Sequence, residues 1–385
     1  MNVIDLFSGV GGFSTGFKKA NYNIVLANEI DKTIAKSYKI NHPETIMINK
    51  DIKDFASNID QEIIEYLKKV GPKQSSIYES YLNNIDVIIG GPPCQGFSMA
   101  GKRIRKNKEF IEDPRNYLFK YYFEVLKYFE PEFFVFENVQ GLLNIKNGDI
   151  LNEIISIFED EKSFKNGKYN VDYYLVDTSK LGIPQKRKRL LIVGSKSYNI
   201  NLKDELSKYI KEDVITLRDA ISDLNYLNTG EGLIENIYLN DPLTQYQIER
   251  RKNSDILFNH VAPVHDENTL RKISLIKEGE NFKNLPENER TKSVHSGAYG
   301  RMEWNKPSYT ITTRFDTPSA GRVIHPDLNR ALTPREAARI QSFDDDFIFI
   351  GNKTSIGKQI GNAVPPLLGK IIAEILNNIV KRENQ

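Results

Sequence analysis

Val3-Ile-Asp-Leu-Phe-Ser-Gly-Val-Gly-Gly-Phe-Ser-Thr-Gly-Phe17 is a short apolar run that passes through a glycine-rich turn into a helix-like stretch. The apolar run predicts a buried strand. Gly9, Gly11 and Gly12 would let the backbone approach a ligand closely, at a helix amino terminus that favours an anionic group. A glycine-rich turn alone is a weak signal, so its meaning depends on the rest of the chain.

The first half of the chain alternates apolar runs with helix-like stretches. This alternation is typical of α/β folds with a parallel sheet. We expect strands at Val3–Leu6, Ile24–Ala27, Thr45–Ile48, Val87–Ile89, Phe133–Phe136, Tyr173–Val176 and Leu190–Val193.

Acidic residues follow two of these strands. Glu29 comes after the second strand, at about the distance where an acidic residue meets ribose hydroxyls in dinucleotide folds. Asp51-Ile52 is a second acidic-apolar pair, after the third strand. The arrangement suits a nucleoside with an uncharged or zwitterionic tail. The alternative is that these acids merely terminate strands.

The chain has one cysteine, Cys94, in Gly90-Gly-Pro-Pro-Cys-Gln-Gly-Phe-Ser98. The glycines and prolines end the apolar run Ile85–Ile89 and place the thiol at the carboxyl end of a sheet, where ligand crevices lie in open α/β folds. A lone thiol on such a turn indicates a nucleophile. The alternative is a small buried hydrophobic residue, which is the usual fate of a free cysteine.

Composition limits the class of protein. With 385 residues, 39% of them hydrophobic, the chain can bury a large core, and we expect two domains. One cysteine excludes a disulfide framework, and the five histidines form no cluster with metal-ligand spacing. We find neither a signal peptide nor an apolar run of membrane-spanning length. We therefore expect a reduced, metal-free, cytoplasmic protein, whose net charge of +2 does not by itself indicate nucleic-acid binding.

Six ordered motifs resemble signatures of the DNA (cytosine-5)-methyltransferases. They are Asp5–Phe13 (the first signature), Gly91–Ser98 (fourth), Arg115–Phe119 (fifth), Glu137–Val139 (sixth), Gln185–Arg189 (eighth) and Lys358–Pro366 (tenth). Any one could arise by chance, but their order could hardly do so. Lys50 departs from the third signature, which usually has a glycine before Asp51-Ile52. Only residues 195–330 lack a recognisable signature.

The resemblance implies a fold and a cofactor. The fold would be a doubly wound, mostly parallel α/β sheet of the S-adenosylmethionine-dependent methyltransferase type, with a smaller, irregular target-recognition domain. The first domain would be discontinuous, comprising 1–195 plus 354–385, and the second would comprise 196–353. The implied S-adenosylmethionine-binding residues are Phe7, Gly9, Gly11, Gly12, Glu29, Ile30, Asp51, Ile52, Pro93, Leu118 and Asn362.

The reaction explains why a thiol is needed. Carbon 5 of cytosine is a poor nucleophile, but addition of the Cys94 thiolate at carbon 6 makes it reactive. Glu137 is the candidate proton donor to ring nitrogen 3, because an apolar setting at the end of its strand would favour its protonated form. Strand alternation directs Arg187 and Arg189 to one side; the resemblance implies that Arg189 meets the base and Arg187 braces the site. Without the resemblance, this basic cluster would be interpreted as a solvated face.

The basic segment 101–116 follows the cysteine and predicts a loop that contacts phosphate while the target base is flipped out of the duplex. A merely solvated charged loop is the alternative. By resemblance, the DNA-contacting residues are Gln95, Ser98, Lys102, Arg103, Arg105 and Thr310. His295–Trp304 mixes glycines, aromatics and arginine, as either a groove-entering loop or an irregular surface loop would.

The carboxyl-terminal part carries two helix signals. Thr333-Pro-Arg-Glu336 has the capping-box pattern and predicts a helix over Pro334–Ser342, to which we assign no chemistry. After Pro365-Pro366, apolar residues recur at helical spacing and predict a final helix that packs on the sheet. They are Leu368, Ile371, Ile372, Ile375, Leu376 and Ile379.

Together these features predict an enzyme that methylates cytosine carbon 5 within a specific double-stranded DNA sequence. We expect a monomer that protects host DNA in a restriction-modification system, with a cognate endonuclease as a functional but not a physical partner. Two alternatives stay open: a transfer-RNA cytosine-5 methyltransferase, and a catalytically idle DNA-binding regulator. The bases that are recognised cannot be deduced from the sequence.

Overall fold

The computed structural model describes residues 1–93, 117–290 and 296–383. Its centre is a seven-stranded sheet in the order β3-β2-β1-β4-β5-β7-β6, in which β7 alone runs in the opposite direction to the other six strands. All seven predicted strands are present. Their bounds are β1 (Asn2–Leu6), β2 (Asn23–Asn28), β3 (Ile46–Ile48), β4 (Val87–Gly90), β5 (Phe133–Val139), β6 (Asn170–Asp177) and β7 (Lys188–Ser195).

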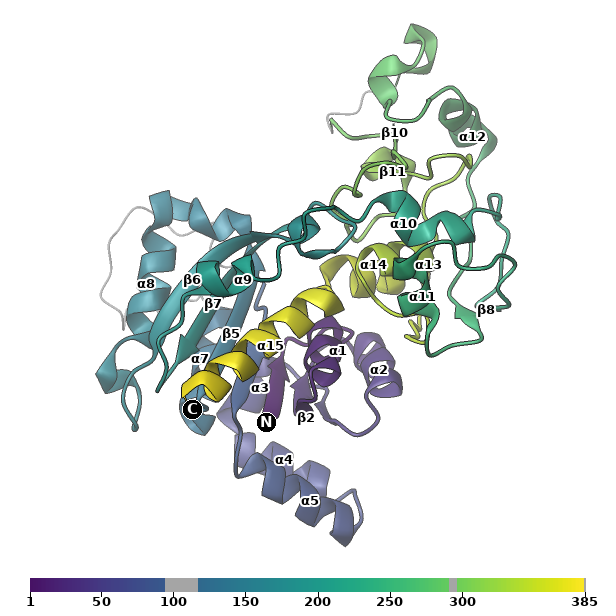
Figure 1. Cartoon of the computed structure of the whole chain (residues 1–385). Helices are drawn as coiled ribbons and strands as arrows, with labels where there is room; N and C mark the ends of the chain where they lie inside the picture. The colour runs from purple at the N-terminus through teal and green to yellow at the C-terminus, as the bar shows by residue number, and fades with distance from the viewer. Residues whose placement is uncertain (94–116, 291–295, 384–385) are drawn as a thin grey trace.

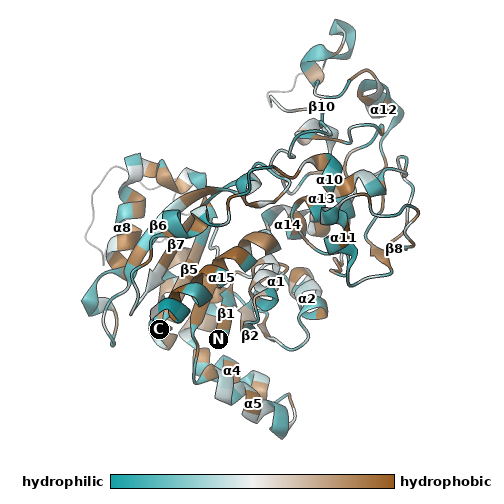
Figure 2. Ribbon diagram, viewed as in Figure 1, coloured by the Kyte–Doolittle hydropathy of each residue, from teal (hydrophilic) through white to brown (hydrophobic). Residues whose placement is uncertain are grey.

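Helices cover both faces of the sheet, as expected for a doubly wound fold (Figure 1). Alternate residues of β1 serve the two faces: Val3 packs with α1 and α15, whereas Ile4 packs with α3, α7 and α8. Figure 2 shows the central strands and much of α15 in the hydrophobic colours. These helices are α1 (Gly12–Lys19), α3 (Ile52–Ser57), α7 (Tyr117–Phe129), α8 (Asp149–Phe158) and α15 (Pro366–Glu383); α2 (Lys32–Asn41) follows β2, and α4 (Ile59–Leu67) and α5 (Pro72–Leu82) project from the sheet.

The predicted final helix is α15, and all six of its predicted apolar residues are buried. It packs closely against α1 at Gly16. A Cβ on Gly16 would come within 2.4 Å of the Pro366 carbonyl oxygen, so only glycine fits at this contact. The helical region Lys353–Arg382 is long and apolar enough to span a membrane by composition, but 67% of its apolar 18-residue window is buried inside the protein. Its hydrophobicity is therefore explained by the core.

The close contact between α1 and α15 predicts that Gly16→Ala destabilises the protein, because the Cβ would meet backbone atoms that cannot rotate away. We expect a loss of about 1–3 kcal/mol in the free energy of unfolding, measured by urea denaturation. Gly141→Ala is the control, since a Cβ there meets only a side chain at 3.7 Å. Equal stability of the two variants would contradict the packing.

We call residues 217–352 the second part of the chain. It consists of short helices and two small sheets, grouped beside α14 (Lys353–Asn362) in Figure 1. The irregular character predicted for this region is confirmed. Its elements are α10 (Leu217–Ile221), α11 (Gln245–Arg251), α12 (Glu267–Ser274) and α13 (Pro334–Ile340), with strand pairs β8 (Glu235–Asn236)/β9 (Leu257–Phe258) and β10 (Gly300–Arg301)/β11 (Arg322–Ile324). The preceding helix α9 (Leu202–Ser207) packs instead on β6 and α15.

The capping box predicted for α13 is present: the Glu336 amide donates to Thr333 Oγ1, and the Thr333 amide donates to Glu336 Oε2. The same glutamate accepts two hydrogen bonds from Arg330, at 2.8 and 2.7 Å, and both side chains are fully buried. Arg339, near the end of the same helix, likewise donates two hydrogen bonds to the carboxylate of Asp345. Buried pairs of this geometry hold neighbouring loops in one arrangement.

Arg301 shows that the stretch His295–Trp304 is not the loop predicted from its composition. In the described part, residues 296–304, Arg301 is only 4% exposed and its guanidinium donates to backbone carbonyls that include those of Ile273, Ile276 and His325. Trp304 is likewise buried. These side chains form the interior of the second part rather than its surface.

Candidate active site

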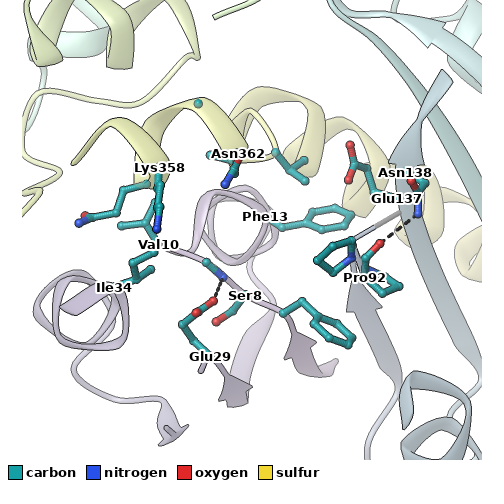
Figure 3. Close-up of a pocket in the computed structure, with 18 of the residues that line it drawn as sticks. Ser8, Val10, Phe13, Glu29, Ile34, Pro92, Glu137, Asn138, Lys358 and Asn362 are labelled. Carbon is teal, nitrogen blue, oxygen red and sulfur yellow. Dashed lines mark hydrogen bonds between the residues drawn. The ribbon is translucent and has the colours of Figure 1, made fainter. Parts of the chain in front are cut away.

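A cavity of about 980 Å³ lies at the carboxyl ends of β1, β2, β4 and β5, facing the second part of the chain. Figure 3 shows residues of the sheet, of the turn before α1 and of α14 around it. The predicted site residues that line this cavity are Phe7, Gly9, Glu29, Ile30, Asp51, Ile52, Pro93, Leu118, Glu137, Arg187, Arg189, Thr310 and Asn362. The cavity therefore brings together most of the predicted cofactor residues with Glu137, Arg187 and Arg189 of the predicted catalytic residues.

Glu29 is fixed by two backbone amides. Its Oε2 accepts from the Gly9 amide at 3.0 Å (Figure 3), and its Oε1 accepts from the Asp31 amide at 2.8 Å. Burial raises the pKa of the Glu29 carboxyl above its usual value. Gly9 adopts a φ of +54°, a conformation that glycine reaches without strain, and this aims its amide at the carboxylate. Each carboxylate oxygen keeps a lone pair for a ligand hydroxyl.

Gly11 and Gly12, which we expected to contact the cofactor, do not line the cavity. Gly11 has a φ of +94° and is the residue before α1, where a Cβ would lie 2.8 Å from the Tyr38 ring. A Cβ on Gly12 would lie 2.3 Å from the Val364 carbonyl oxygen. Their role in the structure is to let the turn pack closely against α2 and against the segment that precedes α15.

Lys50, the departure from the expected third signature, turns away from the cavity. Its ammonium lies 2.6 Å from a carboxylate oxygen of Glu62 on α4. Asp51 and Ile52 behind it line the cavity as predicted, with Asp51 Oδ1 accepting from the Lys53 amide at the start of α3. The lysine therefore leaves the expected position of these two residues unchanged.

Glu137 and Arg189 form an ion pair at the other end of the cavity, with Arg189 Nε 2.6 Å from Glu137 Oε1. The side chains are 13% and 12% exposed, so both face the cavity from a mostly buried position. The apolar setting predicted for Glu137 is wrong, because β5 continues to Val139 and β7 brings the guanidinium alongside. Gly91 leaves room for this carboxylate, since a Cβ there would be 2.9 Å from Glu137 Oε2.

Arg187 is buried in the same wall of the cavity. Its two terminal nitrogens donate to the carbonyl oxygens of Ile311, at 3.0 Å, and Gly361, at 3.1 Å. Burial, followed by the nearby Arg189 charge, lowers the pKa of Arg187 to about 9. The side chain thus joins the strand β7 region to the second part and to α14.

Thr310 is exposed at the cavity, and its hydroxyl donates to the Lys186 carbonyl oxygen at 2.8 Å. Asn138 is buried behind Glu137, and its Nδ2 donates to the Pro92 carbonyl oxygen at 3.1 Å (Figure 3). That bond fixes the loop that leads into the cysteine motif. Cys94 itself, with Gln95, Ser98, Lys102, Arg103 and Arg105, lies outside the described residues.

Asp5 is a cavity residue that the sequence reasoning did not assign. It is 1% exposed, and its carboxylate accepts from Ser14 Oγ at 2.6 Å. Burial raises the pKa of Asp5 to about 7, and the nearby Glu29 charge adds to the effect. The available signal was an acid in the middle of the apolar run that forms β1.

The raised pKa of Asp5 predicts a pH dependence of stability in the cofactor-free protein. Unfolded chains ionise this group above about pH 4, whereas the folded protein keeps its proton to about pH 7, so its contribution to stability falls as the pH rises between these values. Asp5→Asn, which still accepts from Ser14, should be the more stable form at pH 8, by on the order of 2–4 kcal/mol, and show little advantage at pH 4. Thermal unfolding at the two pH values measures this; an advantage independent of pH would contradict the assignment.

The fold and this site define a class, the methyltransferases built on a mixed seven-stranded sheet. The crystal structure of a DNA modification methyltransferase encoded within a prophage (E. coli) matches with a TM-score of 0.72 and 27% identity, covering 99% of both chains. S. pombe Dnmt2 methyltransferase, at 16% identity, matches in fold with a TM-score of 0.57, covering 98% of both chains.

Sequence comparison identifies the family. Residues 1–378 match the model of the C-5 cytosine-specific DNA methylases, so the chain belongs to that family. The type II methyltransferase M.DdeI of Desulfomicrobium norvegicum is 37% identical, over 97% of this chain and 88% of the relative. The type II methyltransferase M1.HphI of Haemophilus parahaemolyticus is 35% identical, over 97% and 86%. The chain is thus a DNA (cytosine-5-)-methyltransferase.

S-adenosylmethionine is the cofactor that this family implies. The residues around the cavity fit it. Glu29 presents a fixed carboxylate suited to ribose hydroxyls, while Phe7, Ile52 and Leu118 supply apolar surface for a flat base. Asp5 adds a buried acid to the wall of a cavity that takes a positively charged sulfonium compound.

Proposed function

We propose that the chain is the modification enzyme of a type II restriction-modification system. It methylates carbon 5 of one cytosine within a specific duplex sequence and thereby protects host DNA from a cognate endonuclease. The type II methyltransferases M.DdeI and M1.HphI support this host role, because this chain aligns with most of their length. The observation that carries the chemistry is the Glu137–Arg189 pair facing the same cavity as Glu29.

The proposed reaction begins with Cys94. Its thiolate adds to carbon 6 of the flipped cytosine, and the ring electrons displaced by this bond make carbon 5 nucleophilic. Bound S-adenosylmethionine supplies the methyl group. Loss of the carbon 5 proton then allows the carbon–sulfur bond to break, which releases the cysteine and restores the aromatic ring.

Glu137 and Arg189 act on the opposite edge of the base. Attack at carbon 6 moves negative charge toward ring nitrogen 3 and oxygen 2, and a donor and a cation placed there stabilise it. We assign nitrogen 3 to Glu137 and the neighbouring oxygen to Arg189. To donate to nitrogen 3, Glu137 would take up a proton from solvent on the carboxyl oxygen that does not face Arg189. Because the two side chains are already paired at 2.6 Å, their geometry is fixed before the base arrives.

The proposal extends to the DNA. Thr310 would lie beside the flipped nucleotide, and Gln95, Ser98 and the loop cations Lys102, Arg103 and Arg105 would contact the strand around it. Flipping costs a few kcal/mol, which such contacts would offset. Residues 1–195 with 354–385 would form the catalytic domain and 196–353 the target-recognition domain of a cytoplasmic monomer that does not bind its endonuclease.

The experiment that tests this function is bisulfite sequencing of a plasmid after expression of the chain. We expect protected cytosines at one reproducible sequence. Cys94→Ala should protect none, because no nucleophile remains, yet it should bind S-adenosylmethionine with wild-type affinity in calorimetry. Purified transfer RNA serves as a competing substrate. Methylation of RNA alone, or protection by Cys94→Ala, would contradict the proposal.

A further inference from the structure

Two segments that are far apart in the sequence are joined next to the wall of the cavity that carries Arg189 and Thr310. The stretch 184–187, just before β7, runs beside 308–311 of the second part. The Lys186 amide donates to the Ser308 carbonyl oxygen at 2.8 Å, and the Ser308 amide donates to the Pro184 carbonyl oxygen at 2.9 Å. The first segment leads into Arg189, and the second contains Thr310.

Two buried glutamines extend this junction to α13 and α14. Gln185 Oε1 accepts from the Ile311 amide at 2.8 Å, and its Nε2 donates to Gln341 Oε1 at 2.8 Å. Gln341 Nε2 then donates to the Ile360 carbonyl oxygen at 2.7 Å. Both side chains are fully buried. We call Gln185 and Gln341 the glutamine bridge.

The glutamine bridge is directional, because each amide uses its oxygen to accept and its nitrogen to donate. Reversal of either amide would set two donors or two acceptors against each other. Segment 310–313 also packs tightly against α14. A Cβ on Gly357 would lie 2.3 Å from the Thr313 carbonyl oxygen, and a Cβ on Gly361 would lie 2.4 Å from the Thr313 amide nitrogen. Segment 310–313 is thus held between the stretch before β7 and α14.

Neither glutamine lines the cavity, so neither touches the base or the cofactor. We propose that Gln185 and Gln341 are positioning residues that fix Arg189 relative to Thr310 across the boundary between the two parts of the chain. This inference rests on the proposed function, since it takes the cytosine to enter between these two side chains. A displacement of about 1 Å in such a group can cost about a hundredfold in rate.

Gln247 provides a matched control. It is equally buried, its Nε2 donates to the Arg218 carbonyl oxygen and to Ser222 Oγ, and its Oε1 accepts from the Leu243 amide. All of these partners lie within the second part. Gln247→Met therefore removes a buried amide with similar bonding but leaves the glutamine bridge intact.

The test compares Gln185→Met, Gln341→Met, their double variant and Gln247→Met in the full-length enzyme. With saturating target duplex, each single bridge variant should lower kcat at least about tenfold, and the double variant should lose little more, because the two amides act as one unit. The Kd for S-adenosylmethionine should stay within about twofold, and Gln247→Met should lower Tm similarly while keeping kcat. Gln341→Asn, which retains the amide but shortens it, replaces any variant that does not fold.

Unchanged kcat in the single variants, multiplied losses in the double variant, or an equal loss of kcat in Gln247→Met would overturn the inference. Hydrogen exchange gives a readout that does not depend on activity. Peptides covering 308–313 should exchange faster in the bridge variants but not in Gln247→Met; equal exchange would overturn the bridge. A wild-type enzyme that methylates no DNA would instead count against the proposed function. In that case, the hydrogen exchange of peptides covering 308–313 would still test whether the glutamine bridge holds this segment.

Discussion

The antiparallel direction of β7 is the constraint on which the rest of the site depends. In a wholly parallel sheet, the start of a strand lies at the edge opposite to the carboxyl ends of its neighbours. Because β7 runs the other way, Arg189 at its start pairs in register with Val139 at the end of β5. The guanidinium thereby reaches Glu137, at the edge where the glycine turn and the cysteine motif also emerge. The reversed direction of β7 thus places the cationic side chain of Arg189 at the edge of the sheet where the cavity lies.

The return of the chain to the seven-stranded sheet is the second condition. Residues after the second part form α14 and α15, of which α15 packs on α1 through Gly16 while α14 lines the cavity with Asn362. The cavity is therefore built from both ends of the sequence. Arg187 secures this closure by bonding Ile311 and Gly361 at once. The wall of the cavity from Arg187 to Asn362 is thereby one packed unit.

Local patterns were sufficient to predict the strands, α13 with its capping box, and the buried face of α15, because each depends on residues close in sequence. The reversal of β7 has no such local signal. The same holds for Glu137, whose partner comes from another strand, and for Gln185 and Gln341, which are 156 residues apart. The predicted role of Gly11 and Gly12 was not found at the cavity, because a glycine turn looks alike whether its space admits a ligand or a neighbouring helix. The composition of 295–304 predicted a surface loop because arginine is usually exposed. The buried position of Arg301 depends on backbone carbonyl partners that the sequence does not reveal.

In the proposed reaction, Cys94 attacks a cytosine held by Glu137 and Arg189. A target duplex that carries 5-fluorocytosine in place of the methylated cytosine probes this attack. Fluorine cannot leave as a proton does, so the adduct should persist after methyl transfer. We predict that mass spectrometry finds a covalent protein–DNA complex that forms only with S-adenosylmethionine and maps to the peptide containing Cys94. Absence of a complex under conditions where ordinary target DNA is methylated, or attachment at another residue, would contradict the account.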